Sequence, residues 1–179
     1  MSTPVIRPAV TADIPYIARI YDHAVRHGTA SFELEPPTME EMARRQAALL
    51  DGGFPYLAAE LAGELVGYAY AGPFRTRPAY RFSVEDSIYI APQRQRRGIG
   101  KMLLEALIEA SAKRGFRQMI AVIGDSTQQA ASIELHRAAG FAMIGVLPAV
   151  GWKFGRWVDS IMMQRALGPG ETVAPAERT

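Results

Sequence analysis

Apolar positions along the 179-residue chain follow two periods, which divide it into alternating strands and helices. Runs with strand-like alternation or β-rich composition predict strands at residues 5–10, 56–60, 64–71, 82–91, 118–123, 141–150 and 157–164. Helical spacing predicts four helices, one from the cap Thr11 to Gly28, one from the capping box at Thr38 to Gly52, and others at 98–112 and 128–139. This order indicates one domain of the α/β (α+β) class over residues 1–167, followed by an aperiodic, flexible tail at 168–179.

The run at 82–91 is the clearest strand, because apolar side chains alternate along it and Pro92 ends it. Val84, Ile88 and Ile90 share one face of this strand. The same alternation places Glu85 on the opposite face and sends Asp86 the other way, which favours a structural role for Asp86.

Composition excludes several classes of chemistry. The chain has no cysteine, so disulfides, thiolate metal sites and a catalytic cysteine are ruled out. It has neither a basic-then-apolar leader nor an uncharged run of the about 18 residues that span a bilayer, so we expect a cytoplasmic protein without membrane contact.

Positive charge is concentrated in one short segment. The net charge is only +2, from 20 Lys and Arg against 18 Asp and Glu. Four of the 20 lie within residues 94–101, and without them 16 basic residues face 18 acidic ones. A nucleic-acid surface usually spreads its cations along a face, so this distribution favours a small polyanion and we expect no nucleic-acid partner.

That segment lies between a strand and a helix, where backbone N–H groups lack helical partners and attract anions. Its glycines permit close approach of a diphosphate, and its side chains add positive charge. The spacing fits neither the Walker motif nor the dinucleotide fingerprint, because Met102 follows Lys101 and Leu103 stands where the third glycine belongs. The candidate anion-binding residues are Gln95, Arg96, Arg97, Gly98, Ile99, Gly100 and Lys101.

The pattern Gln95-x-x-Gly98-x-Gly100, after a strand and before an amphipathic helix, resembles the coenzyme A pyrophosphate loop of the GNAT superfamily of N-acetyltransferases. The runs SVEDSIYI at 83–90, TASFE at 29–33 and KFGRW at 153–157 resemble its phosphinothricin and methionine sulfone/sulfoximine acetyltransferase branch. The resemblance implies the GNAT fold, a mixed and mostly antiparallel sheet of about seven strands with about four helices. It also implies acetyl-CoA as co-substrate, no metal, and a homodimer.

Catalytic roles follow from the same resemblance. It makes Glu85 the general base, acting directly or through water, and assigns the oxyanion donor to the backbone of Ile88, Tyr89 or Ile90. His136, in the helix before Gly-Phe, takes a position from which many members donate a proton to the leaving thiolate; a plain packing role is the alternative. Gln129 stands where members usually have Asn and is expected to contact the cofactor.

The acceptor side rests on the resemblance as well. Phe32 and Glu33 fall in the loop that carries acceptor-side residues, and Arg75 and Arg77 suit a carboxylate, phosphinate or sulfone oxygen. We therefore expect acetylation of the α-amine of a small amino-acid-like molecule. The alternatives are another amine, such as a protein N-terminus or a polyamine, a non-catalytic acyl-CoA-binding module, or a nucleic-acid-binding module.

Overall fold

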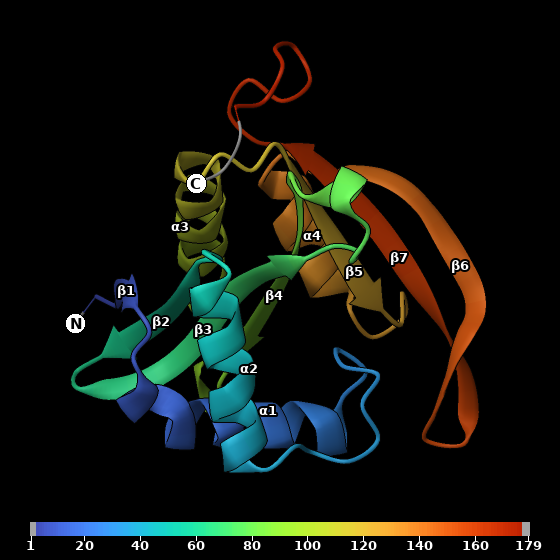
Figure 1. Cartoon of the computed structure of the whole chain (residues 1–179). Helices are drawn as coiled ribbons and strands as arrows, with labels where there is room; N and C mark the ends of the chain where they lie inside the picture. The colour runs from blue at the N-terminus through green and yellow to red at the C-terminus, as the bar shows by residue number, and fades with distance from the viewer. Residues whose placement is uncertain (1–2, 177–179) are drawn as a thin grey trace.

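The computed structural model describes residues 3–176 and confirms the predicted order of elements (Figure 1). The strands are β1 (Val5–Pro8), β2 (Tyr56–Leu61), β3 (Glu64–Pro73), β4 (Ser83–Ile90), β5 (Gln118–Gly124), β6 (Ala142–Lys153) and β7 (Arg156–Ala166). The α-helices are α1 (Ile14–His27), α2 (Met39–Asp51), α3 (Ile99–Lys113) and α4 (Ala130–Ala138). Short 3₁₀ helices lie at Thr11–Asp13, Pro78–Tyr80 and Pro92–Arg94.

All seven strands form one mixed sheet in the order β1-β2-β3-β4-β5-β7-β6. Only β4 and β5 are parallel, joined through α3, and every other neighbouring pair is antiparallel. The predicted fold class is thereby confirmed. The parallel pair lies in the middle of the sheet. If its two strands separate there, the opening connects the two faces of the sheet.

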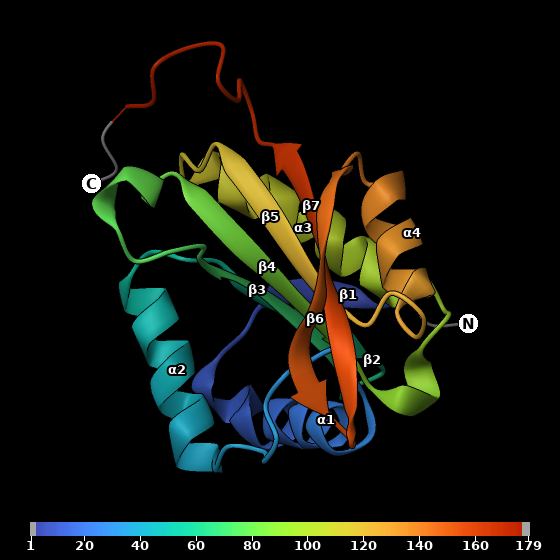
Figure 2. The same cartoon turned by 90° about the vertical axis from the view of Figure 1, so that its right-hand side faces the viewer.

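The helices cover the two faces of the sheet in pairs (Figures 1 and 2). Under α3 and α4 lies the larger apolar cluster, which includes Leu103, Leu107, Met119 and Phe116. Under α1 and α2 lies a second cluster rich in tyrosine, with the rings of Tyr56, Tyr68, Tyr70 and Tyr89 stacked across β2, β3 and β4. Side-chain alternation divides the central strands between the two clusters: Ile88 and Ile90 of β4 pack into the first cluster and Tyr89 into the second, and on β3 Ala69 faces the first and Tyr68 and Tyr70 the second.

The first helix begins differently from the sequence-based expectation. Thr11 opens a 3₁₀ turn rather than capping the helix, and α1 starts at Ile14. The Asp13 carboxylate accepts a hydrogen bond from the Val10 N–H at 2.8 Å and pairs with Arg7, also at 2.8 Å. Asp13 therefore fastens the start of the helix to β1, and the ion pair lowers its pKa below the ordinary value.

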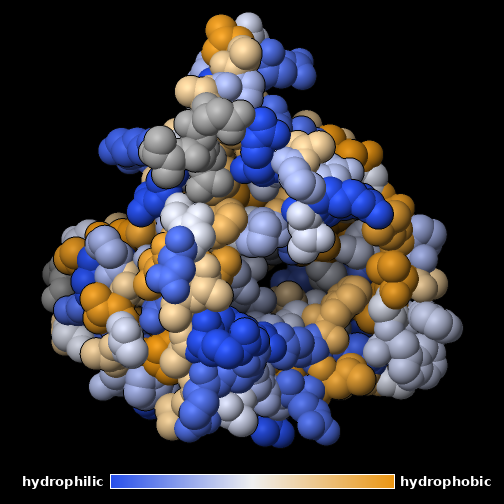
Figure 3. All heavy atoms as spheres, in the orientation of Figure 1, coloured by the Kyte–Doolittle hydropathy of each residue, from blue (hydrophilic) through white to orange (hydrophobic). Residues whose placement is uncertain are grey.

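The β6–β7 hairpin extends from the far edge of the sheet as a long arm (Figure 1). Its turn has Phe154 and Gly155 at φ of 52° and 70°, the two positive values of a tight hairpin. Most of β6 is exposed, including Ile144, Val146, Val150 and Trp152. Orange apolar atoms are visible along the upper part of the right-hand margin in Figure 3, between paler residues.

Within the predicted tail, residues 168–176 form no helix or strand, and residues 177–179 lie outside the described part of the chain. Over residues 3–176, the helices are all too short or too polar to span a bilayer.

Candidate active site

The parallel strands β4 and β5 separate halfway along their length. Their pairing begins at Ser83 and Gln118 and ends at Asp86 and Ala121. Beyond this point β5 pairs only with β7, while β4 keeps its partner β3 as far as Ile90. A gap therefore opens in the middle of the sheet beside the second half of β4.

Backbone alternation identifies the groups of β4 that face this gap. In the antiparallel ladder with β3, Ala91 donates to the Val66 carbonyl at 2.9 Å. Hydrogen bonding to β3 recurs at every second residue, so the Tyr89 N–H is committed to β3 as well. The N–H groups of Ile88 and Ile90 point the other way, toward the place that β5 has left. The predicted oxyanion donor is thus narrowed to Ile88 or Ile90, and Tyr89 is excluded.

A cavity of about 610 Å³ occupies this region and is lined from both faces of the sheet. From the α1–α2 side come Tyr21, Tyr70, Glu85, Ser87 and Tyr89. From the α4 side come Asp86, Ile88, Gln129, Ser132 and His136. The cavity therefore connects the two faces of the sheet at the gap between β4 and β5.

Glu85 is the half-buried carboxylate on the α1–α2 side of the cavity. Burial, and next the charge of Asp86, raise its pKa to about 7. Among the described residues, no hydrogen bond to its carboxylate is formed. The group is thus held near the midpoint of its titration at neutral pH, and its oxygens remain open to a molecule in the cavity.

Asp86 and His136 form a buried pair on the opposite side of β4. His136 Nε2 lies 2.9 Å from Asp86 Oδ2, and His136 Nδ1 lies 2.7 Å from the carbonyl oxygen of Ser132. The two side chains are 3% and 4% exposed. Asp86 was expected to be structural, and alternation correctly placed it away from Glu85. Sequence reasoning missed the contact with a histidine 50 residues later.

Phe32 and Glu33, which lie in the loop before α2, both line the cavity. The Phe32 ring is 41% exposed and lies against Gly151, where an added Cβ would come within 2.5 Å of it. The buried Lys153 ammonium donates to the Ser31 carbonyl at 2.7 Å. The loop is thus fastened to the end of the β6–β7 hairpin.

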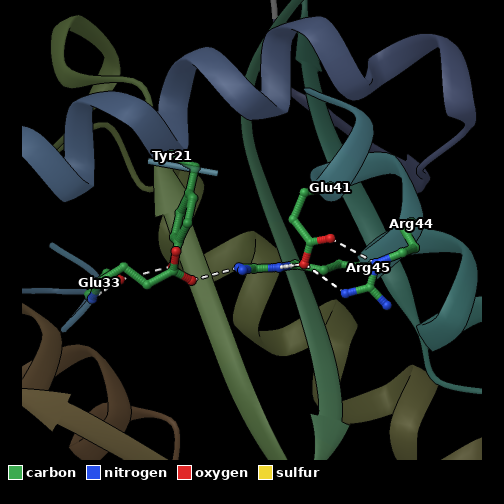
Figure 4. A network of polar contacts seen from close by, with 6 residues as sticks. Tyr21, Glu33, Glu41, Arg44 and Arg45 are labelled. Atoms are coloured by element: carbon green, nitrogen blue, oxygen red, sulfur yellow. Dashed lines mark hydrogen bonds and ion pairs between the residues drawn. The ribbon is translucent and has the colours of Figure 1, made fainter. Parts of the chain in front are cut away.

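Glu33 is held by two other elements (Figure 4). Tyr21 of α1 donates to its Oε1 at 3.0 Å, and Arg45 of α2 donates to the same oxygen at 2.6 Å. Glu41 in turn binds Arg45 at 2.8 Å. The charge of Glu33 is therefore largely compensated from outside the cavity.

The segment predicted to bind a diphosphate lies at the start of α3, outside the cavity lining. Gly98 is the N-cap, with φ of 79° and open space within 4 Å of an added Cβ. No side chain caps this helix end, and its first intrahelical bond runs from Met102 N to Gly98 O at 3.2 Å. The backbone N–H groups that immediately precede Met102 in this segment are therefore free to donate hydrogen bonds to an anion such as a diphosphate.

Arg75 and Arg77 do not line the cavity. Both are exposed in the loop after β3, and the Arg75 guanidinium lies 5.1 Å from the Phe74 ring centre and 5.6 Å from that of Tyr80. Their part in acceptor binding stays a prediction. Gln129, by contrast, lines the cavity at the N-cap of α4.

Other lining residues, Tyr21, Tyr70, Ser87 and Ser132, were not singled out from the sequence. For Ser87 a signal existed, since it shares the face of Glu85 on a strand already identified. Tyr70 lies opposite Ser87 in the ladder, which only the pairing register reveals.

Known acetyltransferases are similar to this chain both in sequence and in structure. Residues 17–141 match the acetyltransferase (GNAT) family. The chain is 53% identical to a phosphinothricin N-acetyltransferase of Alcaligenes faecalis, over 91% of this chain and 82% of that protein. It is 42% identical to an L-methionine sulfoximine/L-methionine sulfone acetyltransferase of Pseudomonas paraeruginosa, over 92% and 95% of the two chains. A crystal structure of a GNAT phosphinothricin acetyltransferase from Sinorhizobium meliloti in complex with AcCoA superimposes with a TM-score of 0.94 at 48% identity, covering 98% of this chain and 94% of that one.

Proposed function

The chain belongs to the GNAT family of acetyltransferases, and on that premise we propose that it transfers the acetyl group of acetyl-CoA to the α-amine of a small amino-acid-like acceptor. Acceptors of the phosphinothricin, methionine sulfone or methionine sulfoximine type are the best candidates, since relatives at 53% and 42% identity carry those names. The structural observation that carries the proposal is the cavity through the sheet, which has Glu85 on one side and the start of α4 on the other.

The donor binds on the face of the sheet that α3 and α4 cover. Its diphosphate fits the uncapped start of α3, where Gly98 leaves room and the backbone of residues 98–101 supplies donors. Arg96, Arg97 and Lys101 add positive charge around this point, and the pantetheine arm reaches the gap beside β4. Acetyl-CoA supplies an activated acyl carbon, and the residues of this chain align it.

Transfer proceeds by direct attack of the amine on the thioester carbon, without a covalent enzyme intermediate. The C–N bond forms, the C–S bond breaks, and coenzyme A leaves as a thiolate that then takes up a proton. The attacking nitrogen must be neutral, and Glu85 takes its proton directly or through one water molecule. A carboxylate with pKa near 7 is matched to that task at neutral pH. The N–H of Ile88 or Ile90 stabilises the negative charge that develops on the acyl oxygen.

The charges around the cavity favour a single amine rather than a polyamine. Three acidic side chains line it, but Glu33 is paired with Arg45 and Asp86 with His136. Only Glu85 is left without a counter-charge among the described residues. Phe32 and Tyr70 flank the apolar part of the acceptor. Arg75 and Arg77 lie outside the cavity lining, and their binding to the acidic group of the acceptor remains part of the proposal.

We also propose that the protein is a homodimer that uses the β6–β7 edge. Met143, Ile144, Val146, Leu147, Val150, Trp152 and Trp157 are each at least 46% exposed along this hairpin. A group of exposed apolar side chains on one hairpin is typical of a protein–protein interface. Trp152 and Trp157 pack edge to face with ring centres 5.1 Å apart, and in the proposed dimer they contact the other subunit.

A cytoplasmic location and the absence of nucleic-acid or membrane partners stay predictions from the sequence. Cell fractionation tests the first. A gel-shift titration at low salt tests the nucleic-acid alternative, which requires binding that weakens as salt is added.

A thiol-release assay tests the proposed activity. The purified enzyme is mixed with acetyl-CoA and with phosphinothricin, methionine sulfone, methionine sulfoximine, a polyamine or a peptide N-terminus. We expect release with the first three, and a rate reduced about a hundredfold or more in Glu85→Gln, in line with the loss of a general base. Binding of acetyl-CoA without release across the whole panel would instead identify an acyl-CoA-binding module.

A further inference from the structure

Both nitrogens of the His136 ring already have partners inside the protein, and these partners limit what the ring can do. Nδ1 faces the Ser132 carbonyl at 2.7 Å, and a carbonyl oxygen only accepts, so Nδ1 carries a hydrogen. Nε2 faces the Asp86 carboxyl at 2.9 Å, so a second hydrogen lies between these two groups. Neither nitrogen can reach a thiolate without breaking one of these bonds.

The surroundings of the ring favour an imidazolium paired with a carboxylate. Burial by itself lowers the pKa of His136, but the hydrogen bond and charge of Asp86 and the Ser132 carbonyl outweigh it and raise that pKa above the ordinary value. Phe141 packs edge to face on the ring, with centres 5.0 Å apart, and blocks rotation. The pair therefore carries no net charge.

Resting on the proposed function, we infer that Asp86 and His136 are a positioning pair for Glu85. The imidazolium offsets part of the effect of the carboxylate that directly follows the base in sequence, and so allows Glu85 to ionise in the range where the enzyme works. His136 acts through Asp86 and does not donate to the sulfur of coenzyme A, the role that the sequence suggested.

No other charged group near the pair, among the described residues, compensates the negative charge of Asp86 in place of His136. Among described residues, it is the only cavity-lining side chain able to carry positive charge. Asp86 Oδ1 is buried without a hydrogen-bond partner, so the bond to Oδ2 is the one that compensates this carboxylate. The stretch of β5 that lines the cavity, residues 121–124, has no titratable side chain.

Other titratable groups facing the cavity are either neutral or paired. Burial raises the pKa of Tyr70 and Tyr89, and raises that of Tyr21 to about 12, so these phenols stay protonated. Glu33 is bound to Arg45. On α4, the exposed Glu134 and Arg137 pair with each other.

Two substitutions move the acid limb of the pH–rate profile in opposite directions. In His136→Gln the amide can still donate to Asp86 but brings no charge, so the acid limb of kcat, measured with saturating acetyl-CoA and phosphinothricin, rises by about one pH unit. In Asp86→Asn the negative charge next to Glu85 is removed, so the limb falls whether or not His136 then keeps its second proton. If either variant lowers kcat equally at all pH values, the role is only structural and the inference fails. If His136→Gln removes an alkaline limb and leaves the acid limb in place, His136 is the acid for the thiolate.

Nuclear magnetic resonance tests the pair without relying on turnover. The chain has three histidines, so ¹⁵N-labelled wild type and His136→Gln together identify the His136 signals. We expect both ring nitrogens to be protonated at pH 7, and the ¹³C-carboxyl signal of Glu85, identified with Glu85→Gln, to titrate at higher pH in His136→Gln. A neutral ring or an unmoved Glu85 titration overturns the inference. Failure of the proposed function is a separate result, namely no thiol release by wild type with any acceptor.

Discussion

The ring of Phe32 occupies the space that a Cβ on Gly151 would need. Its nearest carbons, Cε2 and Cδ2, lie 2.5 and 2.8 Å from that position. Phe32 belongs to the loop before α2, and Gly151 lies 119 residues later on β6. A glycine in the hairpin arm thus determines where an acceptor-side aromatic ring can lie.

Gly151→Ala is therefore expected to displace Phe32 and weaken acceptor binding. Overpacking of this kind typically costs about 1–3 kcal/mol of folding stability. A loss of about 1 kcal/mol in acceptor binding from the displaced ring raises the acceptor KM about fivefold. The KM for acetyl-CoA should not change. Gly145→Ala is the matched control, because it lies on the same strand with open space within 4 Å of the added Cβ. Equal effects of the two substitutions would show that Phe32 does not determine acceptor binding.

Gly98→Ala tests the start of α3 as the diphosphate site. Gly98 has φ of 79°, so alanine there costs about 1 kcal/mol of folding stability, and its methyl group projects near the helix end. We expect the KM for acetyl-CoA to rise several-fold, with little change in acceptor KM.

The control for Gly98→Ala is Gly63→Ala in the β2–β3 turn. Gly63 has φ of 81° and equally open surroundings, so the cost in unfolding free energy should be similar. Steady-state kinetics and urea unfolding separate the two effects. A rise in acetyl-CoA KM in both variants, or in neither, would contradict the assignment of the diphosphate to Gly98.

Glu85 links activity to the pH dependence of stability. Its pKa rises from the ordinary 4.5 to about 7 on folding, so between these values the folded state binds more protons than the unfolded chain. The free energy of unfolding contributed by this residue therefore falls as pH increases from about 4.5 to 7. Urea unfolding followed by circular dichroism should show Glu85→Gln gaining stability relative to wild type over this window, with the gain constant above it. A difference that is independent of pH would mean that burial does not raise this pKa.

Val146→Glu is expected to dissociate the proposed homodimer. Val146 is 50% exposed on β6, so a carboxylate there would be buried without a partner in a dimer interface but solvated in a monomer. Sedimentation equilibrium should show half the wild-type mass. Val5→Glu is the control, since Val5 is 62% exposed on β1 at the opposite edge of the sheet. A monomeric wild type would contradict the proposed homodimer. Dissociation of Val5→Glu but not of Val146→Glu would show that β6 is not the interface.

Local sequence patterns were sufficient to predict the order of the elements, the orientation of the central strand and the charge of the loop before α3. Each of these depends on residues close together in the chain. Alternation along 82–91 placed Glu85 and Asp86 on opposite faces, and glycine with basic residues marked the uncapped helix start at 95–101. Local periodicity and backbone geometry are enough for such predictions.

Which distant residues share the site depends on how the separate elements pack. The separation of β4 from β5 after Asp86 is a matter of strand pairing, and it alone selects Ile88 and Ile90 over Tyr89 as donors toward the gap. The contact of His136 with Asp86, and the position of Arg75 outside the cavity lining, depend on where separate elements pack. Such contacts leave no periodic trace in the chain, because they join positions whose spacing in sequence is unrelated to their distance in the fold.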